Sequence, residues 1–249
     1  MGSRYVVHTG EVEPEVAEGV VTRPVLTEEF GCEYLTQAVR TVTGKAAFHS
    51  GKHEELLFVL AGHGSLRVNG EEHAFGPESG IYIGPDETYE IASDLAEIVC
   101  VKVAEPQGEA GSRRTVSPLG EQELGHATAG REYRILADPS TGFRSGTHFV
   151  GDVPAGEPAP LHYHLYNEVI YVLQGNGILH IDGERNPIYP GACIHLPART
   201  LHQVENTGDV PIREVAVFVP AGSPAAAYLP NGTSAYPGVP NDPLGGVTV

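Results

Sequence analysis

The stretch GEPAPLHYHLYNEVIYVLQG, residues 156–175, decides the fold and carries most of the candidate chemistry. His162 and His164 are separated by one residue, so their side chains project from the same face of an extended segment. Glu168 follows after a short turn and opens an apolar run of strand-forming residues that ends at Gly175. We therefore predict that three metal-ligating side chains converge within one β-hairpin.

A second segment, GACIHLPARTLHQVEN at residues 191–206, brings a fourth candidate ligand, His202, from a distant strand. Neutral imidazoles and a carboxylate suit a divalent first-row metal. Four protein ligands would close a tetrahedral zinc site, whereas an octahedral ion keeps two positions open. We expect one divalent transition metal, with Fe(II) or Mn(II) favoured and Ni, Co, Cu and Zn left open.

The chain repeats this pattern once. ELLFVLAG at residues 55–62 matches EVIYVLQG at residues 168–175, and the turn Asn69-Gly70 matches Asp182-Gly183 at the same offset. Asn-Gly and Asp-Gly favour tight hairpins, because both residues of each pair tolerate positive φ. A repeat of this length predicts two tandem domains of one fold.

The composition favours short strands over long helices throughout the chain, which contains 31 Gly and 20 Pro. The interpretation is an all-β protein with a first domain at residues 1–112 and a second at residues 113–220. Residues 221–249 are rich in Pro and Gly and are expected to form an extended tail. Residues 1–30 are expected to form an irregular arm that packs on the first domain.

The spacing of these residues resembles the two sequence motifs of the cupin superfamily, and the internal repeat makes the chain look like a bicupin. The matching residues are Gly156, His162, His164, Glu168 and Gly175 for the first motif, and Gly191, Pro197, His202 and Asn206 for the second. Arg199 stands where the second motif usually has glycine. The resemblance implies two tandem cupin-type jelly-roll barrels, with a metal inside the second barrel held by His162, His164, Glu168 and His202.

The first half departs from the metal motif. Aligned on Glu55, the first histidine position is filled by His49, whereas Glu90 occupies the position of His202. One interpretation is a second metal site made of His49, Glu55 and Glu90, with His53 as a substitute ligand. The favoured interpretation is a first barrel that binds no metal and has a structural role.

Three further residues are candidates for the chemistry of the second barrel. His195 lies in the segment before His202 and, together with Glu168, is a candidate acid or base, although a packed histidine explains it as well. Arg144 and Arg199 are candidates for binding a substrate carboxylate, because a guanidinium matches that group bidentately. A solvated surface arginine is the alternative for both.

Charge and composition narrow the classes of partner. The net charge is −17, from 15 Lys and Arg against 32 Asp and Glu, so attraction to nucleic acid is not expected. Three scattered cysteines indicate free thiols in a reducing compartment. No apolar run has the length of a membrane span or the form of a signal peptide, so we expect a cytoplasmic protein without membrane contact. Uncovered jelly-roll sheets make a homodimer the expected assembly.

Three functions follow from this pattern. The first is a metal-dependent dioxygenase acting on a small, chelating, oxygenated metabolite. The second is a metal-dependent isomerase, lyase or hydrolase without redox chemistry, in which the ion polarises a carbonyl or holds water. The third is a small-molecule binding protein without catalysis. The fold alone does not decide among them, because function depends on the site.

Overall fold

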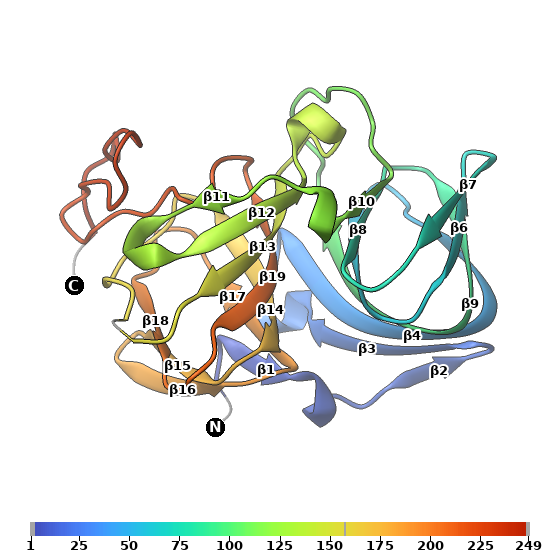
Figure 1. Ribbon diagram of the computed structural model, residues 1–249, viewed down its shortest axis with the longest axis horizontal. Helices are drawn as coiled ribbons and strands as arrows, with labels where there is room; N and C mark the ends of the chain where they lie inside the picture. The colour runs from blue at the N-terminus through green and yellow to red at the C-terminus, as the bar shows by residue number, and fades with distance from the viewer. Residues whose placement is uncertain (1–2, 157, 248–249) are drawn as a thin grey trace.

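The computed structural model describes residues 3–156 and 158–247, and it confirms the prediction of an all-β fold (Figure 1). In the first half lie β1 (Val6–His8), β2 (Glu15–Ala17), β3 (Val20–Leu26), β4 (Leu35–His49), β5 (Glu54–Ala61), β6 (Gly64–Val68), β7 (Glu71–Phe75), β8 (Ser79–Ile83) and β9 (Thr88–Val103). In the second half lie β10 (Val116–Pro118), β11 (Gly125–His126), β12 (Glu132–Ala137), β13 (Thr147–Val153), β14 (Asn167–Gln174), β15 (Gly177–Ile181), β16 (Glu184–Ile188), β17 (Ala192–Leu196), β18 (His202–Asn206) and β19 (Ile212–Val219). Single turns of 3-10 helix connect some of them: η1 (Thr9–Glu11), η2 (Glu28–Phe30), η3 (Leu119–Glu121), η4 (Thr128–Gly130) and η5 (Pro139–Thr141).

The strands form two antiparallel barrels that lie side by side. The first barrel is built on a sheet of order β10-β8-β5-β9-β4-β3-β2, with β6 bridging β7 and β9. Its strands β4 and β9 pair along almost their whole length and curve around the barrel (Figure 1). The second barrel is built on a sheet of order β1-β17-β14-β19-β13-β12-β11 and a smaller sheet of order β16-β15-β18.

Each barrel receives one short strand from the lead-in segment of the other. β1 pairs with β17 of the second barrel, and β10 pairs with β8 of the first. In both cases a single 3-10 turn follows, η1 after β1 and η3 after β10. The expectation of an irregular arm packed on the first domain is therefore wrong in part, because β1 adds an edge strand to the second barrel and only β2 and β3 extend the first. Backbone pairing at an exposed sheet edge accounts for this placement.

Three clusters of buried apolar residues form the core: one inside each barrel and one between them. The repeated apolar run illustrates how one strand serves two of these clusters. In β14, Ile170 and Val172 point into the second barrel, whereas Val169 and Tyr171 point into the layer between the barrels. A strand buried on both faces has a continuous apolar sequence instead of an alternating one.

His148 of β13 lies in the layer between the barrels, 2% exposed, beside Phe58. Its Nδ1 atom has no hydrogen-bond partner among the described residues, and burial lowers its pKa from 6.5 to about 3. Because the unfolded chain takes up this proton near pH 6.5 and the folded chain does not, stability falls as the pH drops below 6.5. We expect His148 to account for a loss of about 2 kcal/mol between pH 7 and pH 5.

Urea unfolding of the wild type and of His148→Leu at both pH values measures this contribution. The variant should lose less stability on acidification, whereas His126→Leu, a change at an exposed histidine, should behave as the wild type. The same pH dependence in His148→Leu and the wild type would contradict the assignment.

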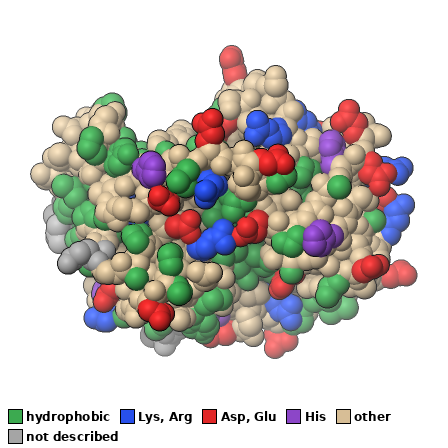
Figure 2. All heavy atoms as spheres, in the orientation of Figure 1, with side chains coloured by type: hydrophobic (Ala, Val, Ile, Leu, Met, Phe, Trp, Pro, Cys, Tyr) green, Lys and Arg blue, Asp and Glu red, His purple; other side chains and the backbone are tan. Residues whose placement is uncertain are grey.

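Within the described residues, no helix has both the length and the apolar composition needed to cross a membrane. Cys32, Cys100 and Cys193 are buried free thiols. On the face shown in Figure 2, acidic side chains are spread over both halves of the molecule and basic side chains lie among them.

Candidate metal centre

Three histidines converge inside the second barrel. The expectation that His162, His164 and Glu168 share one β-hairpin is wrong, because His162 bridges to His202, whereas β14 pairs with β17 and β19. His162 and His202 form an antiparallel bridge, with hydrogen bonds of 3.0 and 2.8 Å between their backbones, and His164 follows two residues after His162. One nitrogen from each ring lies within 4.8 Å of the others. In the described part of the chain, this is the one group of three or more His, Cys, Asp or Glu side chains with such a geometry.

Backbone carbonyls fix the orientation of all three rings. Each Nδ1 lies within hydrogen-bond distance of a carbonyl oxygen, which can only accept, so Nδ1 carries the proton and Nε2 keeps its lone pair. Partners of this kind orient metal-binding histidines. The acceptors are Pro160 at 2.7 Å for His162, Ala226 at 2.8 Å for His164 and Thr200 at 2.9 Å for His202.

The protonation of the cluster suits a cation. Burial is the main cause that lowers the pKa of His202 to about 4 and those of His162 and His164 well below the usual value. All three rings are therefore neutral near pH 7, which is the form that binds metal. The buried Nε2 of His162 has no hydrogen-bond partner among the described residues, as expected for an atom that coordinates an ion.

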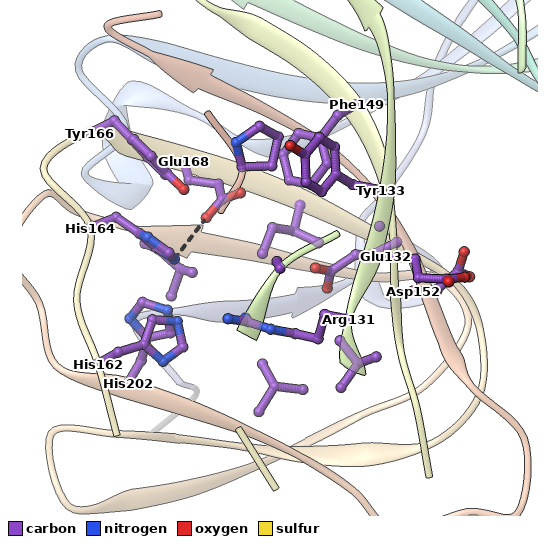
Figure 3. Close-up of a pocket in the computed structure, with 18 residues that line it drawn as sticks. Arg131, Glu132, Tyr133, Phe149, Asp152, His162, His164, Tyr166, Glu168 and His202 are labelled. Carbon is purple, nitrogen blue, oxygen red and sulfur yellow. Dashed lines mark ion pairs between the residues drawn. The ribbon is translucent and has the colours of Figure 1, made fainter. Parts of the chain in front are cut away.

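Glu168, at the start of β14, lies beside this group of histidines (Figure 3). Its Oε2 lies 4.0 Å from Nε2 of His164, and the residue is 3% exposed. Burial, followed by the neighbouring Glu214, raises the pKa of Glu168 well above its usual value, because nothing within the barrel fully balances its charge. A divalent cation would supply that balance, so the residues present fit the expected metal.

The four side chains face a cavity of about 550 Å³, including its open mouth. Its apolar walls are contributed mainly by Phe149, Ile170, Leu196 and Val204. Polar groups beside the cluster come from Arg131, Tyr166 and Glu214. A small, mostly apolar cavity with a few convergent polar groups is typical of a site for a small molecule.

The C-terminal segment forms part of this site. Ala226 accepts the hydrogen bond from His164, Pro224 lines the cavity, and Tyr228 pairs with Tyr163 through two backbone hydrogen bonds of 2.9 Å. The sequence left open whether this segment covers its own barrel or a partner. In the structure it covers its own barrel.

Arg199 is not placed to bind a substrate, which corrects the sequence interpretation. Its guanidinium lies 2.7 Å from Oδ2 of Asp242 and donates to the carbonyl of Gly245 at 2.9 Å. Tyr163 donates to the same carboxylate. Arg199 therefore fastens the C-terminal segment to the barrel, and its φ of +64° explains why the cupin motif usually has glycine at this position.

His195 and Arg144 also lie outside the cavity. His195 shares a face of β17 with Cys193, which packs between the barrels, whereas the intervening Ile194 points into the second barrel. Nε of Arg144 lies 3.7 Å from the carboxylate of Glu54, which is fully buried. Neither residue therefore belongs to the candidate site.

In the first barrel, Glu55 occupies the position that corresponds to Glu168, and basic side chains of the same barrel pair with it. The buried Glu55 accepts a hydrogen bond of 2.6 Å from the Tyr89 hydroxyl, and Arg40 and Lys102 lie 3.8 and 3.4 Å from its carboxylate. The cations of these side chains take the place that a metal would need.

The alternative metal site in the first barrel is not formed. His49 is exposed at the end of β4, and Glu90 points away from the interior and pairs with Lys45 at 2.9 Å. Its neighbours Tyr89 and Ile91 are the residues of β9 that face inward. His49, Glu55 and Glu90 therefore do not converge.

Two cavity residues were missed by the sequence interpretation, Arg131 and Glu214. Arg131 follows a loop without a recognisable motif. Glu214 had a usable signal, because it is the one charged residue among inward positions of β19 that are otherwise apolar, such as Ile212 and Ala216. A charge on the inner face of a barrel strand indicates a functional or paired group.

The class defined by these features is a two-barrel β protein with a buried histidine cluster open to a small cavity. Residues 149–218 match the family model of the Cupin domain. Polyketide synthase CurC of Streptomyces cyaneus is 31% identical over 103 residues, which are 40% of this chain and 67% of that protein. The chain belongs to the cupin superfamily.

Two further comparisons show how much of the chain is similar to known proteins. The uncharacterized protein MJ1618 of Methanocaldococcus jannaschii is 36% identical over 69 residues, which are 27% of this chain, and the chain spans 55% of that relative's length. Oxalate decarboxylase of Bacillus subtilis, solved at pH 4.6, has a TM-score of 0.73 and covers 90% of this chain and 78% of its own. At 17% identity this neighbour shows that the fold is shared.

Proposed function

We propose that this protein is a metal-dependent cupin enzyme that binds one divalent transition metal through His162, His164, His202 and Glu168. The observation that carries the proposal is the common orientation of the three histidines, whose Nδ1 atoms are fixed by carbonyls and whose Nε2 atoms point to one place. Fe(II) and Mn(II) fit best, because an octahedral ion keeps two positions open beside four protein ligands.

The reaction we favour is oxygenation of a small, chelating, oxygenated metabolite. The metal, when bound, would activate such a substrate toward oxygen. Glu168 is the residue placed to accept a proton, since its carboxylate faces the cavity. The apolar walls formed by side chains such as Phe149 and Leu196 would exclude water from the reacting atoms.

Chemistry without oxygen is the second candidate, and one comparison favours it. The structural neighbour is described as a decarboxylase, and decarboxylation needs no net consumption of oxygen. Both candidate reactions use the same metal ligands. Oxygen consumption therefore distinguishes them, whereas the geometry of the site does not. The homodimer and the cytoplasmic location expected from the sequence stay predictions.

The test is oxygen uptake by protein reconstituted with Fe(II) or Mn(II) and supplied with hydroxy acids, keto acids, enediols and catechols. We expect one of these classes to cause oxygen uptake that the metal-free protein lacks. Turnover that continues unchanged under strict anaerobiosis would contradict oxygenation and support the reaction without oxygen. Metal-dependent binding of these compounds without any turnover would identify a binding protein.

A further inference from the structure

Arg131 presents an enclosed, unused hydrogen-bond donor to the cavity. Its Nη2 atom is buried and has no partner among the described residues, while its Nε donates to the carbonyl of Thr128 at 3.1 Å. Leaving a donor of a charged group buried and unpaired costs free energy unless a ligand or water completes it. The cavity therefore contains a buried hydrogen-bond donor that an acceptor group of a ligand could satisfy.

The guanidinium of Arg131 lies across the cavity from the histidines. Figure 3 shows it extending toward His162 and His202, whereas Glu168 lies on the other side of His164. Arg131 and the three histidines line the same cavity. A molecule in the cavity could thus contact the metal position and Arg131 at the same time.

The charges of the cavity leave room for an anion. A divalent metal and Arg131 would bring three positive charges, against at most two negative ones from Glu168 and Glu214. Glu214 has an enclosed Oε2 without a partner among the described residues, and burial raises its pKa to about 7. The metal-loaded cavity therefore keeps at least one uncompensated positive charge.

The other carboxylates of the cavity lining lie beside basic side chains. Asp152 lies 3.3 Å from Nε of Arg213, and Glu132 lies 3.5 Å from Nδ1 of His126. In Figure 3 the Asp152 side chain points away from the histidines. Among the described residues, neither carboxylate forms an ion pair with Arg131.

The loop that carries Arg131 is fixed before any ligand arrives. Ala129 and Gly130 adopt positive φ values of 57° and 69°, and the backbone N–H of Ala127 donates to the carbonyl of Arg131 at 2.8 Å. The hydroxyl of Thr128 donates to the carbonyl of Ala235 in the C-terminal segment at 3.1 Å. A side chain held in this way loses little further freedom on binding.

We propose that Arg131 binds a carboxylate of the substrate, and that the substrate is a small carboxylic acid with a second oxygen donor directed at the metal. α-Keto acids, α-hydroxy acids and short dicarboxylates have this form. The proposal rests on the proposed function, because it uses the same cavity and metal. Arginine suits this role because its planar donors match both oxygens of a carboxylate.

The experiment compares an anionic and a neutral metal ligand on Co(II)-loaded protein, with oxalate and pyruvate as carboxylates and imidazole as the neutral probe. The visible Co(II) spectrum reports the binding of each. In Arg131→Met we expect the dissociation constants of the carboxylates to rise about 10- to 100-fold, as for the loss of a charged hydrogen bond. Imidazole affinity and metal content should stay within twofold of the wild type.

Two further variants make the result specific. Arg131→Lys keeps the charge without the planar donors and should give an intermediate affinity. Arg134→Met removes a guanidinium of β12 outside the cavity lining and should change nothing. Circular dichroism confirms that each variant is folded, and Arg131→Gln replaces Arg131→Met if the latter is not.

The outcomes separate this proposal from the proposed function. Carboxylate affinity that is unchanged in the Arg131 variants, or a wild type that binds neither carboxylate, would overturn the role of Arg131. A wild type that retains no Co(II) would instead overturn the metal site. Titration of oxalate into that metal-free protein by calorimetry would then still show whether binding depends on Arg131.

Discussion

Replacement of His162 by alanine is expected to remove the metal from the protein. The wild type, purified without chelator or affinity nickel, should hold about one equivalent, and the variant less than about a tenth after dialysis. The reason is that His162 supplies one of three converging imidazole donors, and even loss of a partner that merely orients a ligand weakens metal affinity about 10- to 100-fold. Mass spectrometry of the metal content measures both proteins.

A matched control is His195→Ala, which removes a buried histidine of the same barrel on the face of β17 that it shares with Cys193, outside the cavity. This variant should keep the metal. His202→Ala should lose it, because its ring faces that of His162 with centroids 4.4 Å apart. A full metal complement in both His162→Ala and His202→Ala would refute the assignment.

Replacement of Arg40 by methionine is expected to destabilise the first barrel by about 3 kcal/mol without changing the metal content. The change leaves the carboxylate of Glu55, which is 1% exposed, without its guanidinium neighbour. Breaking a buried ion pair by removing one partner costs roughly 3–5 kcal/mol. We expect the lower end, because Lys102 and Tyr89 remain near Glu55.

Urea unfolding followed by circular dichroism measures this loss. Adding Glu55→Gln to Arg40→Met should restore part of the stability, because the unbalanced charge is removed. The exposed pair of Lys52 and Asp86 serves as the control, and Lys52→Met should change stability by less than about 0.5 kcal/mol. A change of metal content in Arg40→Met would show that the first barrel also holds an ion.

The sequence predicted the histidine cluster well because its members lie in two short segments with strong local rules. One intervening residue places His162 and His164 on one face, and this relation holds although they lie outside a regular strand. His202 was assigned through a resemblance in spacing, and the structure brings its ring beside the others. Local spacing and one long-range match to a known motif were therefore enough to predict which histidines lie together.

Other features depended on tertiary contacts that no spacing rule describes. Arg199 had the chemistry of a carboxylate-binding residue, but its partner is Asp242 of the protein itself, 43 residues further along the chain. Arg131 enters the cavity through a loop conformation that positive φ values create. The three-residue strand β1 is too short for its alternation to reveal which sheet edge it would join.

The reciprocal exchange of β1 and β10 has a consequence for how the molecule assembles. If the two halves were separate chains, the same contacts would describe a domain-swapped dimer, whose formation depends on protein concentration. Joining the halves in one chain turns this association into an intramolecular step with a high effective concentration. The barrels should therefore stay paired on dilution, and a cut in the connection after β9 should make their pairing sensitive to dilution.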